Sequence, residues 1–280
     1  MQIAPSPDLS SIVKHYLILE GNVQAADAHR LFSDGNPGII IQYGGTLLQL
    51  TKTASTQIPY PPGFLYGQIS RFHTLFAEER IGLFAIVFKP FGLYALTGMQ
   101  ASTFTDVLLP LQDIWKQEGY DLQEKMLLTG DPLLRVRFVE DFLRQQQRHF
   151  YQPSPFICAA LQLMAHHRGA LSISQLAAQL NATERKMERS FLTEVGLSPK
   201  AYSGILRLQH FLHELRRKSA NTSLTSLAYE CGFSDQAHLI REFRKKVGIT
   251  PLKYGSHAHP LAVNFIRLPA IASDLYNFAG

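Results

Sequence analysis

Two short segments of the sequence, 51 to 52 residues apart, carry side chains of the types that read DNA bases. The first segment contributes Arg185, Lys186, Glu188 and Arg189. The second contributes Gln236, Ala237, His238, Ile240 and Arg241. Arginine pairs with guanine, glutamine with adenine and glutamate with cytosine, while apolar groups contact the thymine methyl. The two segments are therefore predicted to contact base edges in double-stranded DNA.

Basic residues continue the second segment. Arg244, Lys245 and Lys246 continue the same predicted helix and carry the charge that suits phosphate contacts, which add affinity without sequence information. The alternative is that both segments are ordinary solvated helix faces. The same kinds of side chain stand at matching places in both segments, which favours DNA contact.

The segments belong to a duplication between residues 172 and 254. Four apolar positions recur at an offset of 51: Ile173, Leu176, Ala177 and Leu180 match Leu224, Leu227, Ala228 and Cys231. Seven more recur at an offset of 52: Met187, Arg189, Phe191, Val195, Gly196, Pro199 and Tyr202 match Leu239, Arg241, Phe243, Val247, Gly248, Pro251 and Tyr254. A nearly constant offset over eleven positions indicates two copies of one structural unit.

Each unit has the pattern of two short helices joined by a turn. The first four positions follow the spacing i, i+3, i+4, i+7 of one helix face, and Ser172 with Gln175 predicts a capping box. Ala177 and its counterpart Ala228 are small, so a second helix can cross closely, as a helix-turn-helix requires. Thr183 is placed to cap the second helix of the first unit, as Asp235 is in the second.

Further helices connect and support the units. Ser198 and Pro199 predict the start of a long helix between them, whose apolar face continues to Leu215. Ile157, Leu161 and Met164, at i, i+4 and i+7, predict a supporting helix ahead of the first unit. The two units should thus be held at a constant distance.

The charge distribution divides the chain. Residues 1–150 hold 12 Lys and Arg against 14 Asp and Glu, whereas residues 151–280 hold 15 against 8. Two prolines in the stretch 152–155 mark a linker at the same place. We therefore predict a first domain over 1–150, a DNA-binding domain over 155–255 and a tail over 256–280, in which residues 262–268 alternate like a strand.

The first domain is predicted to be an antiparallel sheet or small barrel followed by helices. Runs of β-branched and aromatic residues cover 39–43, 46–51, 64–69, 72–76 and 83–88. Gly44 and Gly45 predict a two-residue hairpin between the first two runs. Acidic residues open predicted helices at 106–109, 121–128 and 131–147. In the last helix, Leu134, Phe138 and Phe142 form a stripe that packs on its own sheet or, as the alternative, on a second copy.

Other functional classes find little support. Two cysteines, Cys158 and Cys231, are too few for a disulfide framework and are expected to be buried thiols. Cys158 stands in apolar surroundings that disfavour a nucleophile, and His29 and His73 lack metal-site neighbours. We expect no catalytic residues, no metal and no cofactor. Tyr43, Gln68 and His73 are polar residues on predicted strands, but they do not define a ligand site. No apolar run reaches the ~18 residues of a membrane span and no secretion signal is visible, so a cytoplasmic protein is expected.

The duplicated region resembles the DNA-binding domain of the AraC/XylS family of bacterial transcription regulators. The resemblance covers about a hundred residues and is strongest in the second unit, where the family motif is matched by Ala228, Gly232, Phe233, Ser234, Asp235, Arg241, Phe243, Arg244, Lys245, Gly248, Thr250, Pro251 and Tyr254. The first unit departs from it with Asn181 in place of a glycine and Ser190 in place of an apolar residue. The first half is similar to the N-terminal sensor domain of one branch of these regulators.

The resemblance implies an α+β protein with an N-terminal antiparallel, cupin-like β-domain and an all-α C-terminal domain of two helix-turn-helix units joined by a long helix. The implied function is sequence-specific regulation of transcription at a promoter or operator, in response to a small molecule. A homodimer, and RNA polymerase for an activator, are the further partners implied. Two alternatives stay open: an effector-independent regulator whose first domain only dimerises, and a cupin-type enzyme fused to a DNA-binding domain.

Overall fold

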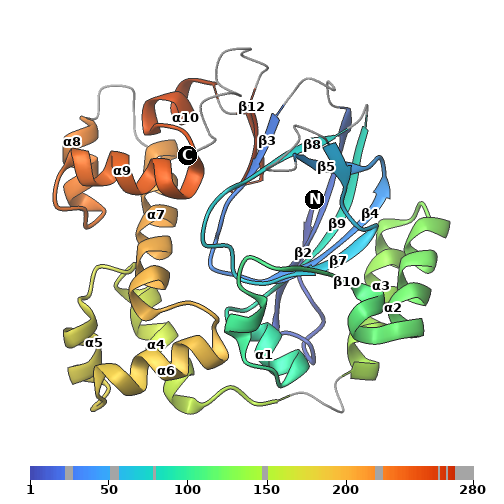
Figure 1. Cartoon of the computed structure of the whole chain (residues 1–280), viewed down its shortest axis with the longest axis horizontal. Helices are drawn as coiled ribbons and strands as arrows, with labels where there is room; N and C mark the ends of the chain where they lie inside the picture. Colours follow the sequence, from blue (N-terminus) through green and yellow to red (C-terminus); the bar gives the residue numbers. More distant parts are fainter. Residues whose placement is uncertain are drawn as a thin grey trace.

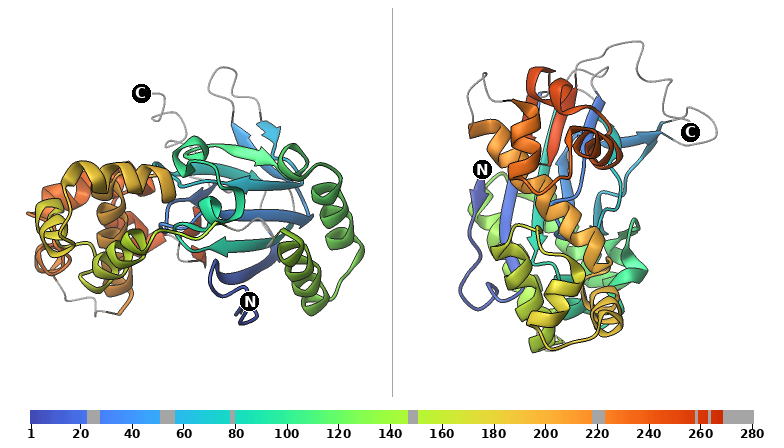
Figure 2. Two further views of the ribbon diagram at one scale, coloured as in Figure 1. Left: turned by 90° about the horizontal axis from the view of Figure 1, so that it is seen from below. Right: turned by 90° about the vertical axis from the view of Figure 1, so that its left-hand side faces the viewer.

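The computed structural model describes residues 1–22, 28–50, 57–77, 80–146, 151–217, 223–257, 259–262 and 264–268. It contains two antiparallel β-sheets and a helical C-terminal region, which confirms the predicted α+β fold class. The sheets occupy one side of the molecule and the helical region the other (Figure 1). Figure 2 shows the sheets in the middle, between the C-terminal helices and the pair α2–α3.

The first sheet holds most of the N-terminal strands. Its order is β1 (Gln2–Ile3), β2 (Val13–Asn22), β9 (Arg80–Phe88), β4 (Gly38–Gly44), β7 (Gly63–Tyr66) and β10 (Leu108–Pro110). Its central strands are buried on both faces. Because neighbouring residues of a strand point to opposite faces, Leu83, Ala85 and Val87 face the second sheet, whereas Phe84, Ile86 and Phe88 face helices.

The second sheet combines strands from both ends of the chain. Its order is β11 (His259–Ala262), β12 (Phe265–Leu268), β3 (Ala28–Leu31), β8 (His73–Ala77), β5 (Leu47–Leu50) and β6 (Gln57–Pro59). Strand β12 pairs with β3, with Phe265 opposite Leu31 and Leu268 opposite Ala28. The predicted strand in the tail is thus confirmed for Phe265–Leu268, and it returns to the first domain. Residues 269–280 of the predicted tail lie outside the described residues.

Helices cover the outer face of the first sheet. They are α1 (Gly92–Thr97), the 3₁₀ turn η1 (Ala101–Phe104), α2 (Leu111–Leu128) and α3 (Pro132–Gln146). Phe142 is buried against this sheet and Phe138 packs on the same cluster, so the stripe of α3 faces its own sheet. Leu134 is half-buried and lies outside that cluster, whereas Val139 and Leu143 belong to it. The buried stripe of α3 is therefore rotated slightly from the predicted one.

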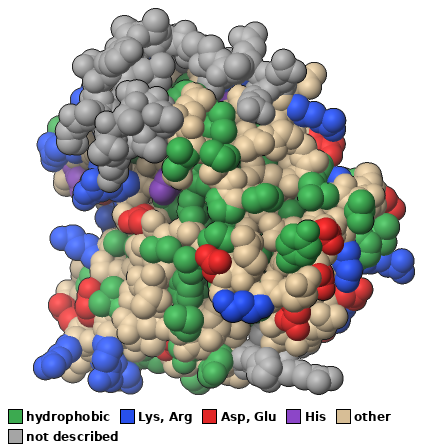
Figure 3. Space-filling model, turned by 45° about the vertical axis from the view of Figure 1, so that its right-hand side comes forward, with side chains coloured by type: hydrophobic (Ala, Val, Ile, Leu, Met, Phe, Trp, Pro, Cys, Tyr) green, Lys and Arg blue, Asp and Glu red, His purple; other side chains and the backbone are tan. Residues whose placement is uncertain are grey.

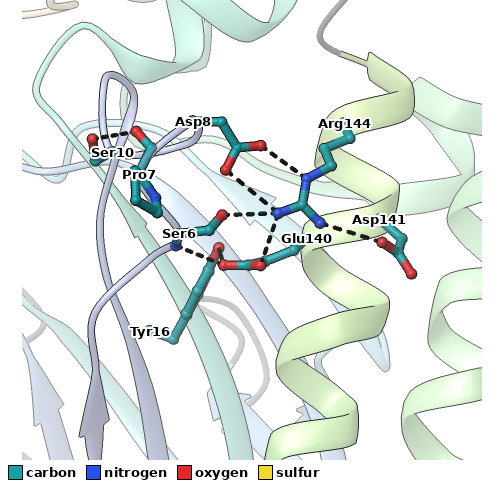
Figure 4. Close-up of polar contacts among 8 residues, drawn as sticks. All are labelled: Ser6, Pro7, Asp8, Ser10, Tyr16, Glu140, Asp141 and Arg144. Carbon is teal, nitrogen blue, oxygen red and sulfur yellow. Dashed lines mark hydrogen bonds and ion pairs between the residues drawn. The ribbon is translucent and has the colours of Figure 1, made fainter.

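A polar cluster ties α3 to the start of the chain (Figure 4). Arg144 Nε donates to Asp8 at 2.8 Å and its Nη2 to Glu140 at 3.1 Å. The same Glu140 accepts from the Ser6 amide at 2.8 Å and from the Tyr16 hydroxyl at 3.3 Å. The Arg144 bond holds the pKa of Asp8 well below its usual value, and burial raises the pKa of Tyr16. These bonds fix α3 against β2 and the residues before it.

The predicted hairpin at Gly44 and Gly45 is wrong. Strand β4 pairs with β7 and β9, whereas β5 pairs with β6 and β8 in the other sheet, so the glycines carry the chain between sheets. Gly45 has φ of +73°, and a Cβ there would collide with the Arg80 carbonyl oxygen. Glycine is required here for close backbone approach as well as for positive φ.

The predicted helix over residues 106–109 is also wrong. Asp106 has φ of +59°, and its carboxylate accepts from the Ser70 amide at 2.7 Å and from the Ser70 hydroxyl. Leu108–Pro110 then forms β10, which pairs with β7. The acidic residue therefore stabilises a turn into a strand, not a helix N-terminus. The predicted helix over 121–128 lies inside α2, and the one over 131–147 corresponds to α3.

The C-terminal region contains seven helices within the described residues. They are α4 (Pro155–His166), α5 (Ile173–Gln179), α6 (Glu184–Glu194), α7 (Pro199–Arg217), α8 (Leu224–Glu230), α9 (Gln236–Val247) and α10 (Pro251–His257). The supporting helix is confirmed, because Ile157, Leu161 and Met164 of α4 are buried beneath the first unit. Among the described helices, none is long and apolar enough to cross a membrane.

The second helix-turn-helix unit shares its core with the β-domain. This second-unit core is the buried cluster of Phe32, Leu208, Phe211, Leu212, Leu227, Ala228, Cys231, Phe233, Leu239, Phe243, Val247, Ile249, Tyr254 and Ile266. Phe32 follows β3 and Ile266 belongs to β12. The first unit also contacts the β-domain, since Thr105 Oγ1 donates to the Gly196 carbonyl at 2.6 Å.

Candidate DNA-binding surface

The first unit is built by local capping and a small-residue crossing. Ser172 Oγ accepts from the Gln175 amide while the Ser172 amide donates to Gln175 Oε1, which confirms the capping box. Asn181 takes the turn at φ of +47°, and Thr183 Oγ1 accepts from the Lys186 amide at 3.2 Å. Ala177 is buried where α5 contacts α6. These features orient α6 with one face outward.

The outward face of α6 carries the four predicted residues of the first unit. Met187 and Phe191 point into the core, and the exposed side chains are Arg185, Lys186, Glu188 and Arg189. The Lys186 ammonium lies 4.7 Å from the centre of the Phe156 ring, a cation–π contact. The other three present charged groups to solvent on one helix.

The second unit repeats the arrangement with different turn residues. Gly232 has φ of +78° and Phe233 is buried, which fixes the turn. Asp235 caps α9 by accepting from the His238 amide at 2.7 Å, and this bond lowers the pKa of Asp235. Both units thus cap their second helix in the way the sequence predicts.

The outward face of α9 carries most of the predicted residues of the second unit. Its exposed side chains are Gln236, Ala237, Arg241, Arg244 and Lys245. Ile240 is partly exposed on the same helix. Gln236 Oε1 accepts from Thr225 Oγ1 at 2.8 Å, which orients the amide.

His238 is directed toward the turn. Its Nδ1 lies 3.0 Å from Ser234 Oγ and accepts from the Ser234 amide at 3.3 Å. Its ring packs edge-on against Phe233, with centroids 5.6 Å apart. In this conformation the imidazole stabilises the turn, although it belongs to the predicted base-reading set.

Lys246 is partly buried and does not face outward with Lys245, so its position does not favour the predicted phosphate contact. It lies seven residues after Leu239 and three after Phe243, which places it on the inner side of α9, beside Gly204 of α7. Burial lowers the pKa of Lys246, and Glu242 is the nearby carboxylate that opposes this shift. Helical spacing alone could have separated Lys246 from Lys245.

The difference between the two lysines predicts a measurable contrast. We expect Lys245→Ala to weaken binding to all DNA sequences about equally and to reduce the slope of log affinity against log salt by about 0.9, because one phosphate contact is lost. Lys246→Ala is the matched control and should leave that slope unchanged. The measurement is fluorescence anisotropy over a salt series. A loss at Lys245 that depends on DNA sequence would contradict the assigned role.

Helix α7 separates the two outward faces. It has 19 residues, so its axis is about 28 Å long, and α6 and α9 lie near its opposite ends (Figure 1). Successive major grooves on one face of a duplex are about 34 Å apart. The spacing of α6 and α9 thus has the order of one DNA turn.

A basic groove beside α7 was not anticipated from the sequence. It lies between α4 and α7 and is lined by Ala165, Arg168, Leu206, His210, His213, Glu214 and Arg217. Burial and the charge of Arg168 lower the pKa of His210. Several Lys and Arg side chains project from the edge of the molecule on the side of the helical region, with Asp and Glu side chains between them (Figure 3). The His and Arg spacing along residues 210–217 is the sequence signal that could have identified this groove.

Two further residues that the sequence did not single out position the units. Glu194 is buried and accepts from the amide and the hydroxyl of Ser154, both at 2.7 Å, so it connects α6 to the start of α4. Arg207 of α7 donates to the Gly169 carbonyl at 2.7 Å. Neither residue faces the outward surface.

The polar residues on the strands separate into two places. Gln68 and His73 line a cavity between the two sheets. Tyr43 lies elsewhere, because its hydroxyl donates to Glu20 at 2.7 Å and its ring packs under Arg135. Burial raises the pKa of the Cys158 thiol, which disfavours a nucleophilic thiolate.

Comparison with protein families gives two matches. Residues 176–257 match a family described as a helix-turn-helix domain, and residues 1–110 match a family described as a domain of unknown function (DUF6597). Relatives named HTH-type transcriptional activator RhaS, from Escherichia coli strain SE11 and from Escherichia coli O9:H4 strain HS, are 34% identical over 86 residues. Those residues are 31% of this chain and 30% of each relative, so less than a third of the relatives' length is matched.

Solved structures are similar over more of the chain but at low identity. The crystal structure of ToxT from Vibrio cholerae O395 has 11% identity and a TM-score of 0.49, covering 86% of this chain and 96% of ToxT. ToxT from Vibrio cholerae strain SCE256, in a structure with a bound unsaturated fatty acid, has 11% identity and a TM-score of 0.48, covering 86% and 94%. The helix-turn-helix match and the RhaS relatives show that residues 176–257 form a helix-turn-helix domain similar to the C-terminal DNA-binding domain of AraC/XylS regulators.

Proposed function

We propose that the protein is a sequence-specific DNA-binding regulator of transcription. The observation that carries this function is the pair of equivalent helices, α6 and α9, whose outward faces present Arg189 and Arg241 at the sixth helical position. The name of the RhaS relatives, transcriptional activators, supports regulation of transcription. In this proposal the base-edge contacts come from exposed residues of α6 and α9, while Arg244 and Lys245 contact phosphates.

Selection of bound sequences from random double-stranded DNA by the purified full-length protein tests the DNA function. We expect an enriched motif of two elements whose centres are about 10 to 11 base pairs apart, since each unit enters one major groove. Enrichment of a single short element would contradict the proposal that each helix-turn-helix unit contacts its own DNA element. Retention of DNA without any enriched motif would contradict sequence specificity.

We further propose that the N-terminal domain, residues 1–150, responds to a small molecule. The support is the cavity between its two sheets, which is lined mainly by apolar side chains. A homodimer in the cytoplasm, and contact with RNA polymerase if the protein activates, complete this proposal. The alternative of a domain that only dimerises predicts that no small molecule changes DNA binding. Because Phe32 belongs to the second-unit core, whole-chain measurements are needed to distinguish the two.

We propose no catalytic role. The Cys158 thiol has a raised pKa, and the two histidines at the cavity have pKa values lowered by burial, without a metal-binding arrangement among the described residues.

A further inference from the structure

Two adjoining cavities lie between the two sheets in the described part of the chain. Both are lined by Leu31, Ile40, Leu47, Tyr66 and Leu75, which connect one cavity to the other. The remaining lining is mainly apolar, so a ligand would gain most of its binding free energy from desolvation of hydrocarbon surface.

One buried polar atom in this lining lacks a partner. The Gln68 side chain is 1% exposed, and its Nε2 donates to the Gly35 carbonyl at 3.0 Å. Its Oε1 accepts no hydrogen bond from any described residue. A buried acceptor without a donor is unfavourable, and a ligand that donates a hydrogen bond would remove this cost.

The charges around the cavities disfavour an anion. No Lys or Arg occurs among the described lining residues, whereas Asp34 and Asp106 line the edges. Burial lowers the pKa of the two histidines in the lining, His15 and His73, which disfavours a positive charge on either ring. A carboxylate or phosphate would therefore lose its hydration without gaining a counter-charge.

The strand after the second unit forms part of the cavity wall. Asn264 and Phe265 line the second cavity, and Phe265 packs with the residues between the sheets. The next residue, Ile266, points the other way and belongs to the second-unit core. The neighbouring strand repeats this division, since Leu31 lines both cavities and Phe32 belongs to the second-unit core. The pair β3–β12 thus contacts the cavity on one face and the second unit on the other.

We propose that these cavities bind a neutral, mainly apolar molecule with a hydrogen-bond donor for Gln68, and that Asn264 and Phe265 are part of this site. Through Ile266 and Phe32, the same wall connects the bound ligand to the second helix-turn-helix unit. This inference rests on the proposed small-molecule response of the N-terminal domain and specifies its ligand class, its C-terminal residues and its route to the DNA-binding helices.

Three indole probes test the ligand class by titration of the full-length protein, followed by NMR. Indole is neutral and has one donor, 1-methylindole lacks the donor, and indole-3-carboxylate adds a negative charge. We expect indole to bind about fivefold more tightly than 1-methylindole and at least about tenfold more tightly than the carboxylate. Equal affinities, or no binding of indole at its solubility limit, would overturn the proposed ligand class.

Two variants assign the probe to this site. Gln68→Leu should lower indole affinity to that of 1-methylindole, while 1-methylindole affinity changes less than about twofold. Phe265→Ala should weaken both probes, because it removes apolar contacts from the wall. The matched control is Phe138→Ala, a half-buried phenylalanine on the outer side of the first sheet, which should leave both affinities unchanged. Unchanged indole affinity in Phe265→Ala would remove β12 from the site.

Amide hydrogen exchange tests the connection to the second unit without DNA. Indole should slow exchange in α8–α10 at least about threefold in the wild type, since ordering the wall reduces local opening. Ile266→Ala should abolish this protection at saturating indole. Phe32→Leu, the second variant at the same interface, should reduce it. Ile39→Ala, on the outer face of the first sheet, should retain it. Protection of α8–α10 equal to that of the wild type in both Ile266→Ala and Phe32→Leu would overturn the proposed route.

The proposed DNA-binding function and the proposed ligand site can be contradicted independently of each other. Indole binding and protection of α8–α10 without any selected DNA motif would contradict the regulator and leave the ligand site standing. A selected DNA motif together with absent indole binding would leave the DNA function standing and overturn the ligand site.

Discussion

Arg241→Ala should weaken binding to the selected DNA site by about 1–3 kcal/mol, and Arg189→Ala should do the same in the other unit. Both arginines are exposed at the sixth position of their helices, where the guanidinium can donate two hydrogen bonds to a guanine edge. The measurement compares equilibrium dissociation constants for the selected site and for DNA of scrambled sequence. The loss should be larger for the selected site, because base contacts carry the specificity.

The double variant, with both Arg189→Ala and Arg241→Ala, provides a second test of DNA contact by both units. The residues lie on separate units at opposite ends of α7, so the two losses should add within about 0.5 kcal/mol. Arg137→Ala, at an exposed position on α3 in the β-domain, is the matched control and should leave both dissociation constants unchanged. Wild-type binding by both single variants would contradict base reading by these residues.

Ala228→Leu should lower the free energy of unfolding by about 1–3 kcal/mol. Ala228 is completely buried in the second-unit core, and three added carbon atoms would have to displace packed neighbours. Ala177→Leu in the first unit should have a similar effect, since Ala177 is 5% exposed at the crossing of α5 and α6. The measurement is denaturant unfolding, followed by circular dichroism.

Ala178→Leu is the matched control for these two variants. Ala178 lies on the exposed side of α5, next to Ala177, and leucine and alanine have similar helix propensities. Its unfolding free energy should therefore stay within about 0.5 kcal/mol of the wild type. If Ala177→Leu and Ala228→Leu were as stable as Ala178→Leu, the close helix crossing would be refuted.

The features that sequence predicted well are local. The capping box at Ser172 and the cap at Thr183 each depend on residues within one helical turn of one another. The duplication is also readable without a structure, because the offsets of 51 and 52 preserve the inward positions of both units. Exposure of Arg185 and Arg241 follows directly from those inward positions.

The predictions that failed concern partners distant in the chain. The glycine pair Gly44 and Gly45 is compatible with a hairpin, but strand pairing with β7 and β9 takes β4 into the other sheet. An acidic residue suits a helix N-terminus, yet Asp106 finds Ser70 and enters a strand. In each case the local sequence was compatible with two local structures, and contacts with residues distant in the chain selected one of them.

The sequence alone determined the two-unit organisation, the helix caps of both units, the inner and outer faces of α6 and most of α9, and the charge difference between the halves. Only the tertiary structure decided which sheet each strand joins, that Gln68 and His73 share a cavity, and that β12 closes it beside the second unit. The physical reason is range. Helix caps and helix faces arise from neighbours a few residues apart. Strand pairing and cavities depend on segments farther apart in the chain, and Phe265 and Ile266 belong to a strand that pairs with β3 more than two hundred residues away.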